Sequence, residues 1–165
     1  MPMKEIVTLR PATIDDLSLL RYWDTQQHVI DCDPDDEWDW EKELPAIHSW
    51  REMLVAELNE NPIGFIQIID PFEEETHYWG KVEKNIRAID IWIGESENLG
   101  KGYGTKMMQL AIDKCFTNPR VTKILIDPLQ SNVKAQRFYE KIGFTFLEER
   151  VFDDVTCCVY ELKRN

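Results

Sequence analysis

One stretch of the sequence reads Leu99-Gly100-Lys101-Gly102-Tyr103-Gly104-Thr105, between a strand-like segment at 87–94 and a helix-like segment at 105–116. Three glycines at alternate positions allow the backbone to turn several N–H groups toward one point, and the helix start adds partial positive charge. Such a loop can hold a phosphate group. It is neither a Walker loop nor the dinucleotide fingerprint, because its glycine spacing differs from both. By itself, the loop is equally compatible with a plain strand-to-helix turn.

The segments around this loop predict a mixed sheet with helices. Alternating or apolar runs predict strands at 5–10, 52–57, 63–69, 87–94, 121–126, 144–147 and 157–162. Helical spacing predicts one helix that begins at Thr13 and two more at 105–116 and 132–142. The turn-rich residues 58–62 predict a hairpin between the second and third strands. Antiparallel strands come first and a strand–helix–strand–helix unit follows. We therefore expect one α/β (α+β) domain over residues 1–165, with a mostly antiparallel sheet flanked by helices.

The net charge of the chain indicates which kinds of partner it can bind. Among 165 residues, 31 are acidic and 19 are basic, which gives a formal charge of −12. Because such a chain repels phosphate backbones and anionic membrane surfaces, we expect no nucleic-acid or membrane partner and favour a cationic small molecule. No apolar run reaches the roughly 18 residues of a membrane span, and the first residues do not resemble a signal peptide. The expected location is therefore the cytoplasm.

The cysteines predict free thiols. Cys157 and Cys158 are adjacent, so in a strand their side chains point to opposite faces and do not readily bond to each other. Cys115 lies in the apolar stripe of a predicted helix and is expected in the core. No cysteine or histidine spacing suits zinc, so we expect no metal ion. A covalent intermediate is not expected either.

Two motifs resemble the signatures of the GNAT acetyltransferases. Gly100-x-Gly102-x-Gly104 resembles the pyrophosphate loop of that family, and residues 131–144 resemble its "N…A…FYEKxGF" helix. The likeness runs from Ile6 to Leu162. It is greatest toward the aminoglycoside 6'-N-acetyltransferases, at 61–64, 88–90, 99–106, 121–124 and 127–128. The family usually has Gln or Arg where this chain has Leu99, so one pyrophosphate donor is missing while the loop amides remain.

The resemblance implies acetyl-CoA as the co-substrate. Its amide arm would lie along the strand that ends at Gly94 and bond to the backbone of Ile91, Trp92 and Ile93. Asn132 matches the signature asparagine and would bond the coenzyme arm, although a residue at this position can equally cap a helix. The pyrophosphate would meet the loop residues Leu99, Gly100, Lys101, Gly102, Tyr103, Gly104 and Thr105.

The resemblance gives the catalytic roles to Asp90 and Tyr139. Tyr139 would donate a proton to the departing CoA thiolate, and the alternative for it is a core tyrosine. Asp90 would hold and deprotonate the acceptor amine, and an outward-facing strand acid is the alternative. Aspartate is disfavoured in the middle of a strand, which independently indicates function. Because an ordinary aspartate of pKa about 3.9 is a weak base toward an ammonium of pKa about 10, Asp90 either has a raised pKa or only orients the amine.

Acidic and aromatic residues predict a pocket for a polycation. By the resemblance, Asp127 at a strand end and Asp154 in the last loop would line an aminoglycoside pocket, although Asp127 could instead belong to a turn. Glu75, Trp38 and Trp40 are further candidates, because carboxylates and flat apolar walls together suit a polycation. Both tryptophans lie in the acidic run 31–43, which is otherwise typical of a solvated loop.

The expected activity is acetyl transfer from acetyl-CoA to a primary amine of a cationic small molecule. The resemblance favours the 6'-amine of an aminoglycoside, attacked directly in a ternary complex. Another amine (a polyamine, a siderophore precursor or a protein N-terminus) is one alternative, and an acyl-CoA-binding sensor without turnover is another. A pure binder needs neither Asp90 nor Tyr139, so these residues favour an enzyme. A monomer and a homodimer both remain open.

Overall fold

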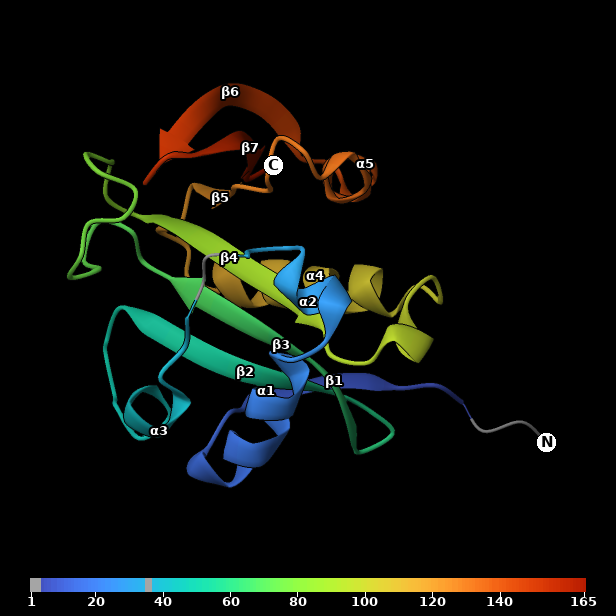
Figure 1. The fold of residues 1–165 in the computed structure, drawn as a ribbon. Helices are drawn as coiled ribbons and strands as arrows, with labels where there is room; N and C mark the ends of the chain where they lie inside the picture. Colours follow the sequence, from blue (N-terminus) through green and yellow to red (C-terminus); the bar gives the residue numbers. More distant parts are fainter. Residues whose placement is uncertain (1–3, 35–36) are drawn as a thin grey trace.

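The computed structural model describes residues 4–34 and 37–165, and its strands form one sheet (Figure 1). The strand order is β1-β2-β3-β4-β5-β7-β6, and among the described strands β4 and β5 form the one parallel pair. The predicted mixed, mostly antiparallel sheet is therefore confirmed. The strands are β1 (Val7–Pro11), β2 (Arg51–Leu58), β3 (Asn61–Ile69), β4 (Ile86–Ile93), β5 (Lys123–Ile126), β6 (Thr145–Phe152) and β7 (Val155–Lys163).

Helices cover both faces of the sheet (Figure 1). On one face lie α1 (Leu17–Trp23), α2 (Gln27–Ile30) and α3 (Trp40–Glu43), and on the other lies α4 (Tyr103–Phe116). The helix α5 (Val133–Ile142) follows β5, and two 3-10 turns are η1 (Ile14–Asp16) and η2 (Ser96–Asn98). The apolar stripe of α4 packs on the sheet in one core cluster, in which Cys115 is buried as expected. All four cysteines have free thiols.

Strands β4 and β5 separate partway along their length. Only residues 86–88 of β4 pair with β5, whereas β4 pairs with β3 as far as Ile93. The sequence explains the separation, because β5 has four residues and is followed by Asp127-Pro128, and proline has no N–H for a ladder. The second half of β4 therefore has an open edge toward β5.

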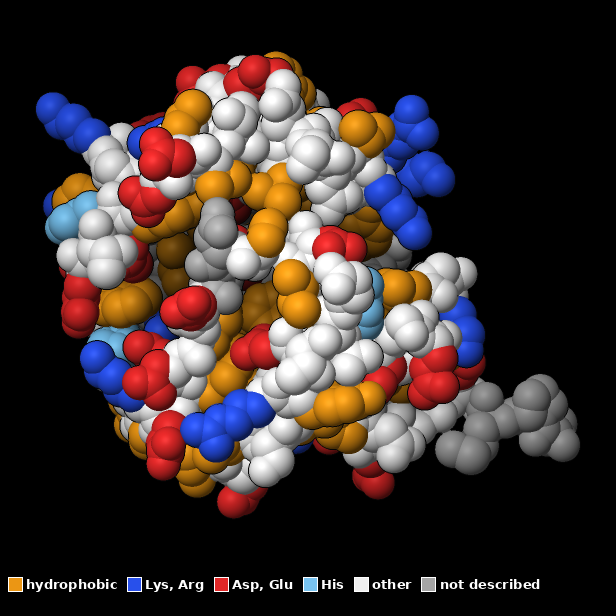
Figure 2. Space-filling view, viewed as in Figure 1, with side chains coloured by type: hydrophobic (Ala, Val, Ile, Leu, Met, Phe, Trp, Pro, Cys, Tyr) orange, Lys and Arg blue, Asp and Glu red, His pale blue; other side chains and the backbone are white. Residues whose placement is uncertain are grey.

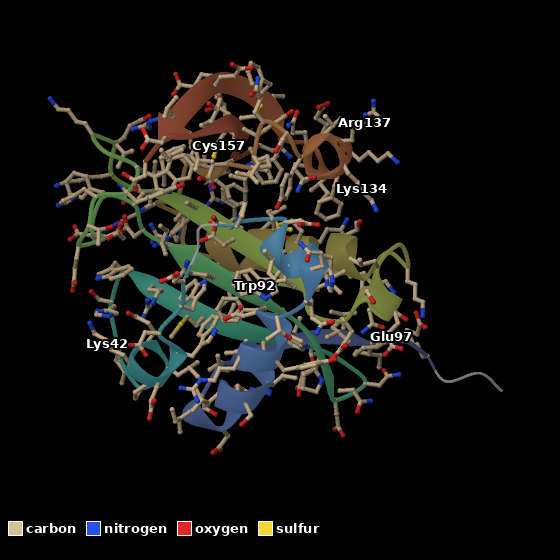
Figure 3. All side chains as sticks on the ribbon, in the orientation of Figure 1. Lys42, Trp92, Glu97, Lys134, Arg137 and Cys157 are labelled. Atoms are coloured by element: carbon tan, nitrogen blue, oxygen red, sulfur yellow. The ribbon has the colours of Figure 1, made fainter. Side chains whose placement is uncertain are left out.

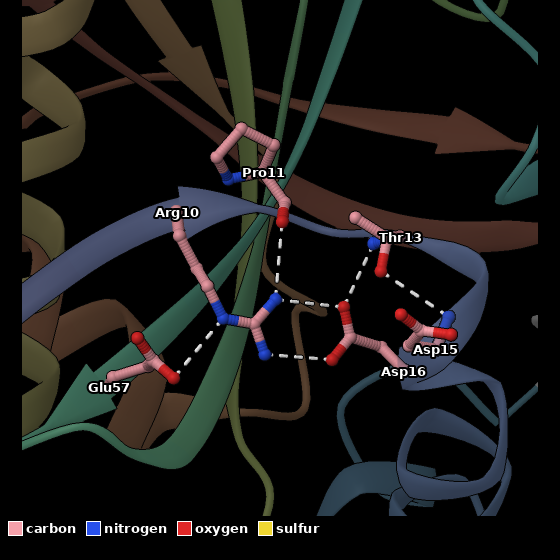
Figure 4. A network of polar contacts seen from close by, with 6 residues as sticks. All are labelled: Arg10, Pro11, Thr13, Asp15, Asp16 and Glu57. Carbon is pink, nitrogen blue, oxygen red and sulfur yellow. Dashed lines mark hydrogen bonds and ion pairs between the residues drawn. The ribbon is translucent and has the colours of Figure 1, made fainter.

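An ion-paired cap joins the first strand to the first helix (Figure 4). Thr13 Oγ1 accepts a hydrogen bond from the Asp15 N–H, and Asp16 accepts one from the Thr13 N–H, which confirms the predicted helix start. Arg10 binds Asp16 through two nitrogens at 2.8 and 2.9 Å and also contacts Glu57. Burial alone would raise the pKa of Asp16, but the bonds from Arg10 and Thr13 lower it below the usual value.

Candidate active site

A cleft of about 830 Å³ opens where β4 and β5 separate. Figure 2 shows this face of the molecule hollowed, with apolar side chains inside the hollow and acidic side chains around it. Trp92 lies on the sheet at one side of the cleft and Cys157 lies at the other (Figure 3). The predicted catalytic pair, Asp90 and Tyr139, lines this space together with six predicted binding residues: Trp38, Glu75, Ile91, Trp92, Asp127 and Asn132.

The open edge of β4 offers the backbone of alternate residues. The Gly94 N–H donates to the Ile63 carbonyl, and in an antiparallel pair the bonded and non-bonded positions alternate. The N–H and C=O groups of Ile91 and Ile93 therefore face the open side, as the resemblance implied. The backbone of Trp92 instead faces β3, so its expected backbone role is corrected and its side chain is what reaches the cleft. A ring nitrogen of His28 already lies 2.7 Å from the Ile93 carbonyl oxygen.

The glycine-rich loop has the geometry of an open anion cradle. Gly100 and Gly102 have φ values of +73° and +84°, and a Cβ at either would meet no atom within 4 Å. Gly102 is also the N-cap of the 14-residue helix α4, whose first N–H groups have no partner inside the helix. The N–H groups of the first turn of α4 are thus free to meet a phosphate, whereas the Leu99 N–H already donates to the Ser96 carbonyl at 3.1 Å. The Tyr103 side chain turns away from this role, because it is buried and donates to Glu5 at 3.0 Å.

Two aspartates converge in the cleft, and each has a polar partner. Gln67 donates to Asp90 Oδ2 at 2.8 Å, and the Tyr78 hydroxyl donates to Asp127 Oδ2 at 2.7 Å. Asp90 is accessible from the cleft but enclosed by protein, and this desolvation raises its pKa against the lowering effect of Gln67, with the charge of Asp33 adding to the rise. Burial, and then the charge of Asp90, raises the pKa of Asp127 while Tyr78 opposes the rise. The pair therefore retains a proton more readily than ordinary carboxylates, and an ammonium between them would reverse this.

Tyr139 presents a protonated hydroxyl to the same cleft. Its ring lies edge-on to Phe144 at 5.9 Å and tilted to Phe138 at 5.2 Å. Burial, followed by the charge of Asp90, raises the pKa of Tyr139 well above that of an ordinary phenol. The hydroxyl is thus a hydrogen-bond donor at neutral pH. The ring packs against the core, as the alternative interpretation expected, and the side chain also lines the cleft, so the catalytic role stays a prediction.

Asn132 caps a helix, which was one of its two expected roles. Its Oδ1 accepts a hydrogen bond from the Ala135 N–H at 3.1 Å, so it is the N-cap of α5. It lines the cleft as well. Lys134 and Arg137 project from the same helix to the outside (Figure 3).

The predicted acceptor residues divide into two groups. Trp38 and Glu75 line the cleft, and Glu75 lies at its rim, 3.6 Å from His48. Trp40 does not line it: its ring is 1% exposed, stacks under Trp38 at 4.3 Å and donates to Asp24. Asp154 is likewise absent from the lining, where its neighbour Asp153 takes part instead. The expectations for Trp40 and Asp154 are corrected accordingly.

Sequence reasoning missed three contributors to the cleft. Gln67 faces Asp90 directly in the antiparallel register of β3 and β4, and a glutamine inside the apolar run 63–69 was the available signal. Tyr78 lies in the polar segment 70–85, which has no periodicity to locate it. Asp33 belongs to the acidic run, whose residues look alike in sequence.

In residues 4–34 and 37–165, no group of three or more His, Cys, Asp or Glu side chains is placed to hold a metal ion. Over the same residues, none of the helices has the length and apolar character needed to cross a membrane.

Comparisons with known proteins agree on one family. The sequence model described as "Acetyltransferase (GNAT) domain" matches residues 13–152. The aminoglycoside N(6')-acetyltransferase type 1 of Klebsiella pneumoniae is 32% identical over 152 residues, which cover 84% of this chain and 73% of that protein. The spermidine N(1)-acetyltransferase of Escherichia coli (strain K12) is 28% identical over 156 residues, covering 88% and 76%. A crystal structure of aminoglycoside acetyltransferase AAC(6')-Ib with coenzyme A and kanamycin superposes with a TM-score of 0.87 at 30% identity, covering 96% and 95%.

Proposed function

Because this chain belongs to the GNAT acetyltransferase family, we propose that it transfers the acetyl group of acetyl-CoA to the 6'-amine of an aminoglycoside, within a ternary complex. The observation that carries the proposal is the paired carboxylates of Asp90 and Asp127 in a cleft that opens on the free edge of β4. A carboxylate pair suits an acceptor with several ammonium groups. Relatives that are named for aminoglycoside acetylation support the same acceptor class.

The open edge and the glycine-rich loop fit acetyl-CoA as co-substrate. The outward backbone groups of Ile91 suit the amide arm, since an extended chain can add to a strand edge. At Ile93 the N–H faces the same side, while the carbonyl oxygen already lies 2.7 Å from a ring nitrogen of His28. The loop from Leu99 to Thr105 suits the pyrophosphate, because no side chain fills the space above Gly100 and Gly102. Asn132 lines the cleft and can contact the arm.

The chemistry follows from the two carboxylates and the phenol. Asp90 orients the substrate ammonium and accepts its proton, directly or through water; its raised pKa makes it a better base than an ordinary aspartate. The free amine then attacks the thioester carbonyl, so that a C–N bond forms and the C–S bond breaks. The CoA thiolate leaves and becomes the thiol by taking up, directly or through water, the proton that the attacking nitrogen loses as the amide forms. Because the raised pKa of Tyr139 exceeds the roughly 8.5 of an ordinary thiol, Tyr139 acts mainly as a hydrogen-bond donor to the thiolate.

Acetyl-CoA should stabilise the fold through the glycine-rich loop. At about 100 times its dissociation constant, the ligand is expected to add roughly 2.7 kcal/mol to the free energy of unfolding. Gly102→Ala places a methyl group where the phosphate approaches, so its shift in melting temperature on addition of acetyl-CoA should be smaller. The matched control is Gly143→Ala, because Gly143 also has a positive φ, +123°, lies outside the loop, and a Cβ there would come no closer than an ordinary contact of 3.7 Å with Leu162. Equal shifts in both variants and the wild type would contradict this role of the loop.

Asp127 should select acceptors by charge. Asp127→Asn keeps the shape and can still accept from Tyr78, but it removes one negative charge. For kanamycin the Michaelis constant should rise about 5- to 150-fold, equivalent to ~1–3 kcal/mol, and added salt should mimic part of the rise. The same substitution should raise the melting temperature near neutral pH. The pKa of Asp127 is higher in the folded protein than in the unfolded chain, so the wild type loses stability as pH rises from the unfolded pKa through the folded pKa. Asparagine does not ionise, so the variant avoids this loss. Unchanged kinetics with kanamycin would indicate a neutral or singly charged acceptor.

A thiol-release assay over a panel of acceptors tests the proposal. Wild-type protein with acetyl-CoA should release CoA fastest with 6'-amino aminoglycosides such as kanamycin and ribostamycin. Spermidine deserves a place in the panel because one relative is a spermidine acetyltransferase. Faster release with spermidine or a peptide would assign that amine as the acceptor in place of an aminoglycoside. No release with any amine would favour an acyl-CoA sensor.

A further inference from the structure

Tyr78 reaches the cleft from the segment that connects β3 to β4. Its hydroxyl donates to Asp127 Oδ2 at 2.7 Å across 49 residues of sequence. The ring is stacked on Phe152 at 4.6 Å with 8° between the planes, and it meets Trp79 edge-on at 5.9 Å. Two aromatic neighbours therefore fix the direction in which the hydroxyl points.

The segment that carries Tyr78 is itself anchored. Glu74 is 6% exposed, and its carboxylate accepts hydrogen bonds from the Tyr78 N–H, the Thr76 hydroxyl and the Thr76 N–H. Arg150 on β6 donates to the Trp79 carbonyl at 2.7 Å. These contacts hold the backbone on both sides of Tyr78. The loop that brings the Tyr78 hydroxyl to Asp127 is therefore fixed by its own hydrogen bonds.

The groups around Asp127 determine how strongly the hydrogen bond from Tyr78 affects its ionisation. The titratable groups that face Asp127 are Asp90 on β4, Asp33 after α2, Tyr139 on α5, Cys157 on β7 and Tyr78 itself. Burial and the first two of these favour the protonated carboxyl, whereas the hydrogen bond from Tyr78 favours the carboxylate. The backbone N–H of Asp127 itself also bonds to this carboxylate. Because each carboxylate oxygen can accept two hydrogen bonds, the bonds from Tyr78 and from the backbone still leave room for another donor at Oδ1.

We propose that Tyr78 is a positioning residue of the acceptor site, which holds Asp127 Oδ2 so that the ionised Oδ1 receives a second ammonium group of the acceptor. This inference rests on the proposed function for its acceptor class, a small molecule with at least two ammonium groups. With Tyr78 in this role, the segment between β3 and β4 helps to select the acceptor. One amine of the acceptor is acetylated beside Asp90 while Asp127 holds a second ammonium group.

The kinetic test compares Tyr78→Phe with a matched control. Tyr78→Phe keeps both ring contacts and removes only the hydroxyl, so KM for kanamycin should rise about tenfold while kcat at saturation changes little. The rise should be larger at low pH and should shrink as pH increases, because Asp127 then ionises without help. Tyr160→Phe removes a comparable tyrosine–carboxylate bond, to Glu140, from a residue outside the cleft lining, and should leave KM and its pH dependence unchanged. An unchanged KM in Tyr78→Phe, or a rise equal at every pH, would overturn the inference.

A second readout keeps the inference testable if the acceptor class is wrong. A carbon-13 NMR titration of the aspartate side chains in the full chain, without substrate, should show a higher pKa for Asp127 in Tyr78→Phe than in the wild type. No displacement of that titration would overturn the positioning role of Tyr78. If the wild type acetylates no aminoglycoside, the proposed function fails, and the NMR titration still decides the role of Tyr78.

Discussion

Asp90→Asn is expected to lower kcat by about 10²–10⁴-fold with saturating aminoglycoside, the usual contribution of a general base. The substitution keeps the shape and can still accept the hydrogen bond from Gln67, so the loss arises from the missing charge and basicity. Steady-state kinetics at saturating substrate measure it. Asp113→Asn, an exposed aspartate on α4 outside the cleft, is the control and should retain full activity. A wild-type kcat in Asp90→Asn would contradict the general-base role and leave Asp90 as a strand residue without a part in the chemistry.

The pH profile of the wild type gives this role a second signature. Because desolvation raises the pKa of Asp90, its carboxyl remains protonated at pH values where an ordinary aspartate is ionised. A protonated carboxyl can neither hold an ammonium nor accept its proton. The rate should therefore fall as pH drops through a value above the ordinary range of aspartate.

Tyr139→Phe is expected to lower kcat by about 10²-fold, the lower end of the range for a general acid, with little change in KM. The low end applies because the raised pKa of Tyr139 favours hydrogen bonding over complete proton transfer. The packing on Phe138 and Phe144 is retained, so the free protein should keep its melting temperature.

The control for this substitution is Tyr22→Phe, since Tyr22 is 50% exposed on α1. The control should show unaltered kinetics. Full turnover in Tyr139→Phe would mean that the side chain serves packing alone.

The strand and helix pattern of the second half could be predicted because its periods are strong. The helix expected at 105–116 is found as Tyr103–Phe116, and the strand at 87–94 as Ile86–Ile93. The strand expected at 144–147 continues to Phe152 in the structure. Its solvent-exposed edge position permits the polar residues Glu148, Glu149 and Arg150, which hide the alternation on which a prediction depends.

The acceptor side of the cleft could be predicted only in part. Asp90 could be singled out because it is a charged residue within an apolar strand, and Asp127 because it is an acidic residue at a strand end. Which tryptophan faces the cleft depends on how α3 packs, and Trp40 is turned into the core against Phe65. The partnership of Tyr78 with Asp127 depends on the path of a long irregular connection, which no local period encodes.

The acceptor and the nitrogen that is acetylated are both read from an NMR spectrum of the product that the wild-type protein makes from kanamycin and acetyl-CoA. We predict a single acetyl group on the 6'-nitrogen, because the amine beside Asp90 is the one attacked while Asp127 holds another ammonium. The acetyl group on a different nitrogen, or unmodified kanamycin together with intact acetyl-CoA, would contradict it.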